Sequence, residues 1–206
     1  MTAREMQYEF EMSIRQLGKA IDREWLSSEV EDYLNQAQEI FFLREYSEYD
    51  RTEAVKKDLS NLVQHYSSTS FTQDATNMPN GYYVSIPVTV LYVVSEWATY
   101  NSVFTKVKPI THDYYTINKD NPLKQPYSRL IWRVDINGKH ELVTDGLYSL
   151  SEYFMRYIQQ LPDIVISTNT SCVLNSITHS RIVDIAVSEA LKDYQAGLLY
   201  NQKNNE

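Results

Sequence analysis

The chain has 206 residues, of which 43% are hydrophobic, and its 19 Lys and Arg against 27 Asp and Glu give a formal net charge of -8. This length predicts one domain, or one domain with an elaborated insertion, whose core needs no disulfide bonds. An acidic chain lacks the basic surface that supplies most affinity for nucleic acids, so tight wrapping of DNA is not expected. The single cysteine, Cys172, excludes an intramolecular disulfide and a cysteine-based zinc site.

The first third of the chain is predicted to be helical. Apolar residues recur at steps of three and four between Met6 and Ile21, which is the pattern of one helix face. Residues 28–31 read Ser-Glu-Val-Glu, a capping-box pattern that opens a second helix. A third, shorter helix is predicted over 55–62, and the three helices would pack as a small antiparallel bundle. The polar stretch 67–80 is expected to be a loop.

From Gly81 onward the chain is rich in β-branched and aromatic residues, which are typical of strands. Strands are predicted over 82–86, 88–100, 151–158 and 164–167. Two alternatives stay open: a helical turn just after Pro87, and a helix over 151–158, whose periodicity also fits one. Residues 130–136 and 139–144 flank Asn137-Gly138, a pair that readily adopts the positive φ angles of a type I′ turn. These two segments are therefore predicted to form a β-hairpin.

The carboxyl end returns to a helical pattern. Apolar residues between Ile182 and Tyr194 line one face, and the polar tail after Tyr200 is expected to be frayed until a partner binds it. The predicted fold class is α+β, with an amino-terminal helical bundle, a β-rich insertion with hairpins, and a carboxyl-terminal helix that returns to the bundle. The boundaries are expected at 1–66, 67–174 and 175–206, with the first and last segments folding as one unit.

Residues 107–127 combine features that rarely occur together. Pro109, Pro122 and Pro126 argue against a long helix or a central strand, because proline lacks an N–H donor and restrains the residue before it. The segment nevertheless carries much apolar surface, contributed by Ile110, Tyr114, Tyr115, Ile117, Leu123 and Tyr127. It is therefore predicted to be an ordered loop, packed either on its own domain or on a partner.

No catalytic, cofactor-binding or metal-binding residues are predicted. The four histidines have no metal-binding spacing, and the five glycines are isolated, so they cannot build a phosphate-binding loop. The neighbours of Cys172 supply no positive charge that would activate its thiol. The protein is therefore not expected to be an enzyme.

Three blocks of sequence resemble, in order and spacing, the neck proteins of short-tailed, crAss-like bacteriophages. The first block contains Tyr33-Leu34-Asn35-Gln36-Ala37-Gln38, then Lys57-Asp58-Leu59 and Leu62-Val63. The second is the segment 107–127, reading V-K-P-I-T-H-D-Y-Y and then D-N-P-L-K-Q-P-Y, followed by Trp132-Arg133. The third is His179-Ser180-Arg181-Ile182-Val183-Asp184-Ile185-Ala186-Val187.

This resemblance implies a virion structural protein of the head-to-tail connector, an adaptor that forms a ring under the portal. Its partners would be copies of itself, twelve by analogy with the portal's symmetry, together with the portal protein and other neck or tail ring proteins. Double-stranded DNA would pass through without specific binding, and no membrane or cofactor is expected. The protein would be made in the host cytoplasm and reside in the virion neck.

Two sets of residues are predicted to carry this role. The expected contacts with another subunit or the portal are Tyr114, Tyr115, Pro122, Tyr127, Leu199, Tyr200, Asn201, Lys203 and Glu206. Residues 1–65 hold 8 Lys and Arg against 14 Asp and Glu, so this part would suit a channel lining that does not retain DNA. The expected channel-facing acidic residues are Glu29, Asp32 and Glu39.

Other hypotheses stay open at this point. The tyrosines of segment 107–127 could pack within their own domain, because buried tyrosines are also common in cores. The protein could be a binding module or assembly chaperone that never enters the particle. An enzyme would require ionisable side chains that converge in a closed pocket.

Overall fold

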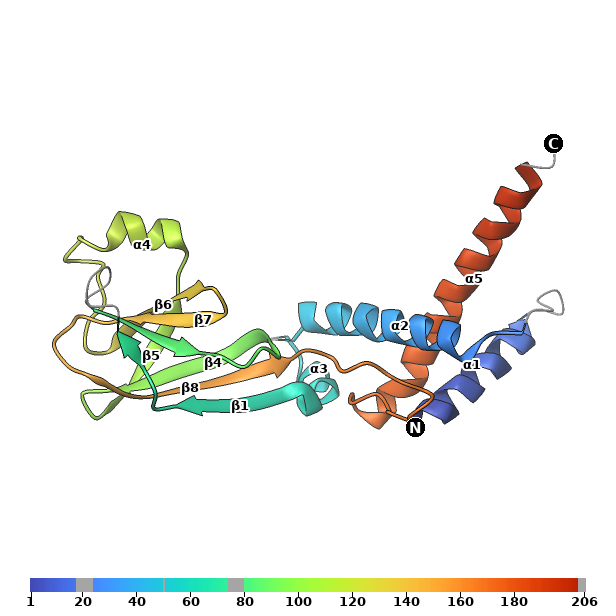
Figure 1. Ribbon diagram of the computed structural model, residues 1–206, viewed down its shortest axis with the longest axis horizontal. Helices are drawn as coiled ribbons and strands as arrows, with labels where there is room; N and C mark the ends of the chain where they lie inside the picture. Colours follow the sequence, from blue (N-terminus) through green and yellow to red (C-terminus); the bar gives the residue numbers. More distant parts are fainter. Residues whose placement is uncertain (18–23, 50, 74–79, 204–206) are drawn as a thin grey trace. The chain divides into compact units, whose positions relative to one another are not determined.

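The structure, a computed structural model, describes residues 1–17, 24–49, 51–73 and 80–203, and for residues 17 and 197–203 the backbone alone. The chain divides into two compact units, a helical unit of Met1–Leu62 with Leu161–Glu206 and a sheet unit of Val63–Gln160 (Figure 1). Helices precede and follow a central curled sheet, so the predicted α+β class is confirmed. The segment 161–174 belongs to the helical unit rather than to the sheet.

The core of the helical unit is formed by α1 (Ala3–Leu17), α2 (Ser27–Ser47) and α5 (His179–Lys203), with a 3-10 turn at Ser176–Thr178 before α5. Helix α5 packs against both α1 and α2 (Figure 1). Their apolar stripes meet in a core that includes Met6, Phe10, Ile14, Leu34, Phe41, Val183, Ala186 and Ala190. The buried side chains recur at three and four residues, which explains why the sequence pattern predicted these helices correctly.

The predicted third helix is present, with Thr52 as its cap, but it is shorter than expected and its predicted place in the bundle is wrong. Helix α3 spans only Glu53–Asp58, none of its six residues is buried, and a 3-10 turn at Ser60–Leu62 follows it. Leu59 and Leu62 are buried, but both lie beyond the end of α3. The third place in the bundle is therefore taken by α5, whose apolar face is longer and can cover both α1 and α2.

Polar side chains of α2 hold the segment that returns from the sheet. The Asn35 amide accepts the N–H of Ile164 at 2.7 Å and donates to the carbonyl of the same residue at 3.1 Å. One turn away on α2, the Glu31 carboxylate accepts the N–H of Ile166 at 2.6 Å. The strand predicted over 164–167 is therefore wrong, since its backbone groups bond to α2 apart from one bridge between Val165 and Thr170.

The capping box predicted from residues 28–31 is displaced along the chain. Helix α2 begins at Ser27, and it is Glu29 that accepts the backbone N–H of Leu26, at 3.1 Å. Glu31, which the pattern assigned to this role, instead bonds the returning segment. A carboxylate in the first turn still satisfies an otherwise unpaired N–H group, as the principle behind the pattern requires.

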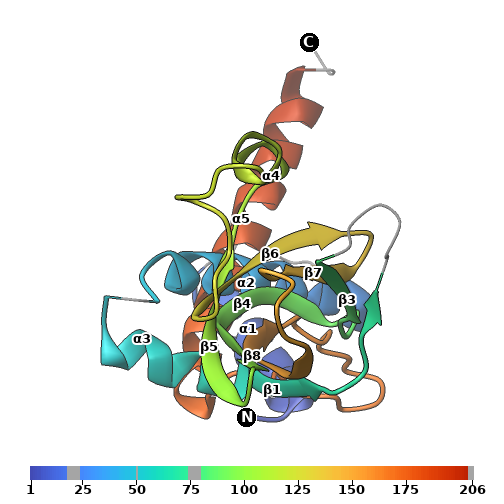
Figure 2. The ribbon, with the colours of Figure 1, turned by 90° about the vertical axis from the view of Figure 1, so that its left-hand side faces the viewer.

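One curled sheet of eight strands forms the sheet unit, in the order β1-β8-β4-β5-β6-β7-β3-β2 (Figure 2). The strands are β1 (Val63–Ser68), β2 (Thr72–Gln73), β3 (Gly81–Ser85), β4 (Val90–Tyr100), β5 (Val103–Pro109), β6 (Leu130–Ile136), β7 (Lys139–Val143) and β8 (Leu150–Gln159). The expected loop over 67–80 is wrong where it overlaps the end of β1 and all of β2, and residues 74–79 lie outside the described residues.

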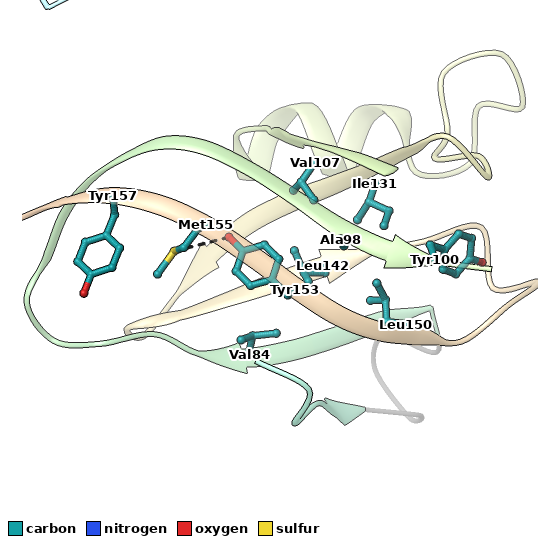
Figure 3. Close-up of a cluster of buried hydrophobic side chains, with 10 residues drawn as sticks. All are labelled: Val84, Ala98, Tyr100, Val107, Ile131, Leu142, Leu150, Tyr153, Met155 and Tyr157. Atoms are coloured by element: carbon teal, nitrogen blue, oxygen red, sulfur yellow. Dashed lines mark hydrogen bonds between the residues drawn. The ribbon is translucent and has the colours of Figure 1, made fainter. Parts of the chain in front are cut away.

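The concave face of the sheet holds one hydrophobic core. Figure 3 shows side chains from six strands that point into it: Val84, Ala98, Tyr100, Val107, Ile131, Leu142, Leu150, Tyr153, Met155 and Tyr157. In β4 and β8 the core residues alternate, with Ala98 and Tyr100 on one strand and Tyr153, Met155 and Tyr157 on the other, as the two-residue period of a strand requires. The predicted hairpin is confirmed as β6–β7, with φ angles of 48° at Asn137 and 70° at Gly138.

Segment 107–127 is not the irregular loop that its prolines predicted. Residues 107–109 end β5, which lies between β4 and β6, and helix α4 (His112–Asn118) follows with Thr111 as its cap. Pro109 is tolerated because it is the last residue of its strand, and the ladder continues from the N–H of Ile110 to the carbonyl of Arg133 at 2.9 Å. Strands β5 and β6 run parallel, and α4 belongs to the connection between them.

A tight turn after β7 gives a testable prediction for stability. Gly146 has a φ angle of +74°, and a Cβ atom there would lie 2.4 Å from Oδ1 of Asn80. Gly146→Ala should therefore lower the free energy of unfolding by about 1–2 kcal/mol from backbone strain, and further from the clash. Urea denaturation of both variants would compare it with Gly138→Ala, where φ is +70° but no atom lies within 4 Å. Equal losses for the two alanines would show that Asn80 imposes no constraint.

Candidate interaction surfaces

The two tyrosines of α4 that were expected to contact a partner pack on their own sheet. The rings of Tyr114 and Tyr115 lie edge-on to the indole of Trp132 in β6, at centroid distances of 5.6 and 6.5 Å. Trp132 is only 1% exposed, whereas both tyrosines remain half-buried. Their inner edges therefore stabilise α4 on the sheet, and their outer edges are left to solvent or to a partner.

After α4 the same segment turns outward. Pro122 is exposed, Leu123 is 95% exposed and Tyr127 is 55% exposed, while Pro126 is buried and anchors them. Ile117, on the outer side of α4, is 77% exposed. Apolar side chains gathered on one exposed segment are a mark of surfaces that bind other proteins.

The acidic residues expected to face a channel lie on one side of α2. Glu29, Asp32 and Glu39 are spaced by three and seven residues, opposite the side on which Leu34 and Phe41 are buried. Asp32 and Glu39 are exposed, whereas Glu29 is half-buried and occupied by the cap described above. The structure thus gathers the three carboxylates on one side of the helix.

The carboxyl-terminal residues expected to bind the portal lie on α5. The helix continues through Leu199, Tyr200 and Asn201 to Lys203, so residues 201–203 are helical rather than frayed, and Glu206 lies outside the described residues. In the helical unit, the end of α5 extends beyond α1 and α2 (Figure 1). A projecting helix end is an element that a neighbouring protein can bind in a groove.

A network of ionisable groups lies inside the sheet unit and had no signal in the sequence. The Arg133 guanidinium bonds the Glu96 carboxylate at 3.2 Å, and the Tyr153 hydroxyl donates to the same carboxylate at 2.9 Å. Nδ1 of His140 lies 2.8 Å from that hydroxyl, and Asp135 pairs with Nε of Arg133 at 3.2 Å. Burial lowers the pKa of His140 to about 4, so its ring is neutral at pH 7, and burial raises the pKa of Glu96.

This network is not arranged as a catalytic site. Its members bond one another, and the side chains of Glu96 and Arg133 are 5% and 9% exposed. A cleft of about 270 Å³ does occur beside α4, but it is lined by other residues, among them Tyr115, Lys119 and Asp145. The network therefore links the side chains of β4, β6, β7 and β8 and stabilises the sheet.

The cysteine thiol and the possible metal ligands give no sign of a reactive site either. Burial raises the pKa of the Cys172 thiol to about 11, which leaves it protonated and unreactive. Among the described residues, no three His, Cys, Asp or Glu side chains gather as metal ligands. In the same part of the chain, no helix is long and apolar enough to cross a membrane.

Sequence reasoning also missed a surface on the convex face of the sheet. Four aromatic rings from neighbouring strands form what we call the aromatic strip: His65 of β1, Phe154 of β8, Trp97 of β4 and Phe104 of β5. Phe154 is at the centre, with centroid distances of 6.0 Å to His65, 5.8 Å to Trp97 and 6.3 Å to Phe104. The alternation Tyr153, Phe154, Met155 could have indicated that Phe154 lies opposite the core, but the strand neighbours could not be read from the sequence.

Exposed apolar and aromatic surfaces such as segment 117–127 and the aromatic strip are typical of proteins that bind other proteins. The family described as phage tail ring protein 3/4 matches residues 1–198, and the chain belongs to that family. It is 29% identical over 189 residues to Ring protein 3 of Bacteroides phage crAss001, a match that covers 77% of this chain and 81% of that relative. It is also 28% identical over 132 residues to Ring protein 4/5 of the same phage, covering 55% of this chain and 56% of that relative.

The expected relationship to ring proteins of crAss-like phages is thereby confirmed, and the chain is a structural ring protein of the phage particle. The family match spans both units, from α1 into the last turns of α5.

Proposed function

We propose that this protein forms a ring of twelve copies in the phage neck, where it joins the portal to the tail and lines part of the channel for DNA packaging and ejection. The observation that carries the proposal is the family match over residues 1–198. Its partners are copies of itself, the portal protein and the other neck or tail ring proteins. Each copy makes the same head-to-tail contact with the next, so that the ring closes.

The exposed surfaces support this arrangement. Pro122, Leu123 and Tyr127 offer apolar area to a neighbouring subunit, and the end of α5 offers a helix to the adjoining ring. The acidic side of α2, with Asp32 and Glu39 exposed, faces the channel, because like charge lets DNA pass without sticking.

Cryo-electron microscopy of purified particles, combined with quantitative mass spectrometry, tests the proposal. We expect a neck ring of twelve copies that contacts the portal, with Asp32 and Glu39 turned toward the channel. A chain absent from purified particles but abundant in infected cells would instead identify a non-virion binding module or assembly chaperone. A ring in which Asp32 and Glu39 point outward would eliminate the channel assignment alone.

Deleting residues 201–206 is expected to weaken docking to the portal by about tenfold or more while leaving the fold intact. The fold should survive because Ala190 is the last buried residue among the α5 side chains that the structure describes, which end at residue 196. Circular dichroism would check the fold, and binding to immobilised portal would check docking. As a control, Lys139→Ala alters an exposed residue of the β6–β7 hairpin and should bind the portal normally. Equal portal affinity with and without residues 201–206 would contradict the docking role.

A further inference from the structure

The aromatic strip is an exposed, largely apolar surface of the sheet. Phe104 is 74% exposed, His65 is exposed, and Trp97 and Phe154 are half-buried. Their rings contact one another across four adjacent strands, β1, β8, β4 and β5, so they form one continuous surface. Clustered aromatic rings of this kind are enriched at the centres of protein interfaces.

Two cations and one carboxylate border the strip. Glu152 lies on the same face of β8 as Phe154, opposite Thr99, whose other register partner is Phe104. The guanidinium of Arg156 lies 5.8 Å from the ring centre of Trp97, and Arg156 is exposed beside it on β8. Lys106 is the register partner of Trp97 on β5, and its side chain is exposed. The charged groups of both side chains stay in water next to the rings, where they can form ion pairs with carboxylates of another protein.

The acidic charge of the chain lies on the other unit. The helical unit, residues 1–62 and 161–206, holds 11 Lys and Arg against 19 Asp and Glu, which is the whole net charge of -8. The sheet unit, residues 63–160, holds 8 against 8 and is neutral. With Lys106 and Arg156 against Glu152, the strip carries a net positive charge on a neutral unit, so it is complementary to the helical unit of another copy and not to a second strip.

From these charges we infer that the aromatic strip docks on the helical unit of the neighbouring copy in the ring. The contact is heterologous, because different surfaces of the two copies meet, and repetition of such a contact generates a ring when the rotation between copies closes. Phe104 and Trp97 supply its apolar centre, and Lys106 and Arg156 pair with carboxylates at its rim. This inference rests on the proposed ring of copies and adds to it the surface that joins them.

Photocrosslinking of the full-length chain tests the contact directly. With p-benzoylphenylalanine in place of Phe104, a mixture of isotopically labelled and unlabelled copies is irradiated and digested, and the crosslinked peptides are sequenced. We expect crosslinks between copies, with the acceptor peptides in residues 1–62 or 161–206. The same probe in place of Leu147, which is 74% exposed but off the strip, should give at most a tenth of that yield.

Charge reversal at the rim of the strip provides a second test of the contact. The double substitution Lys106→Glu/Arg156→Glu is expected to raise the dissociation constant between copies about tenfold or more, because it brings carboxylates to an acidic surface. Lys139→Glu, which changes charge equally per site on the exposed β6–β7 hairpin, should leave association unchanged. Sedimentation velocity measures association, and circular dichroism confirms that each variant is folded.

Several results would overturn the inference while the proposed ring stands. They are crosslinks from strip to strip, crosslinks within a single chain, or the absence of crosslinks among copies that still associate. Loss of DNA binding with unchanged association in the Lys106→Glu/Arg156→Glu variant would assign the strip to DNA instead. A wild-type chain that never associates would contradict the ring of copies itself, and this inference would fall with it.

Discussion

Arg133→Met is expected to lower the free energy of unfolding by about 3–5 kcal/mol, because it leaves a charged partner buried without compensation. The partner is Glu96, whose side chain is 5% exposed and receives the guanidinium at 3.2 Å. Without Arg133, the Glu96 carboxylate keeps its hydrogen bond from the Tyr153 hydroxyl but loses its positively charged partner. Urea denaturation at pH 7, followed by near-ultraviolet circular dichroism, measures the loss, and hydrogen exchange in β4 and β6 locates it.

A double variant separates this effect from lost packing. Glu96→Gln/Arg133→Met removes both charges, so it should recover at least half of the stability lost in Arg133→Met. Arg129→Met, at an exposed position just before β6, should change stability by less than about 0.5 kcal/mol. If the single and double variants lose the same amount, the buried ion pair contributes nothing and only the packing of Arg133 matters.

Trp132→Ala is expected to cost about 3–5 kcal/mol, the usual range for removing a fully buried tryptophan. The indole is 1% exposed and supports both Tyr114 and Tyr115, so its loss should also release α4 from the sheet. Amides in the second half of α4, from Tyr115 to Asn118, should then exchange with solvent much faster than in the wild type. Urea denaturation and hydrogen exchange measure the two effects.

Conservative changes at the same contact provide the controls. Tyr114→Phe keeps the edge-on ring and should cost less than about 1 kcal/mol, and Pro122→Ala, at an exposed site, should cost still less. Unchanged exchange in α4 after Trp132→Ala would show that α4 does not depend on this contact. Its tyrosines would then be held by other parts of the sheet unit.

Where local chemistry decides the structure, the sequence is sufficient. Asn137 and Gly138 adopt the positive φ angles that their turn type requires, so the hairpin follows from two residues. Helices α2 and α5 follow from apolar spacing, because each buries one continuous stripe. The α+β class then follows from the order of these segments along the chain.

Where tertiary partners decide, the sequence is insufficient. Residues 55–62 have apolar spacing like a bundle helix, but the choice between this segment and α5 depends on which can cover α1 and α2. Strand β1 reads Val-Gln-His-Tyr-Ser-Ser, which is too polar to predict, and its pairing with β8 joins residues far apart in the chain. Pro109 argued against a central strand only because its place at the end of β5 was unknown.

The interaction surfaces were only partly accessible in advance. Segment 107–127 was singled out correctly as ordered, but its two halves differ: Trp132 attracts Tyr114 and Tyr115, while Pro122 and Tyr127 face solvent. The aromatic strip and the pair of Glu96 with Arg133 could not be predicted, because both depend on the strand order. Composition identifies the residues for such contacts, whereas only topology brings them together.

The insertion of the sheet unit between α2 and α5 also sets the order of events during synthesis. Helices α1 and α2 leave the ribosome first, but α5, which covers their apolar side, is made last. At about 5–20 residues per second, the intervening chain takes on the order of ten seconds to translate. During that interval α5 does not yet cover Phe10, Leu34 and Phe41. A nascent or truncated chain therefore exposes an apolar helix face through which it can associate with neighbouring chains on the polysome.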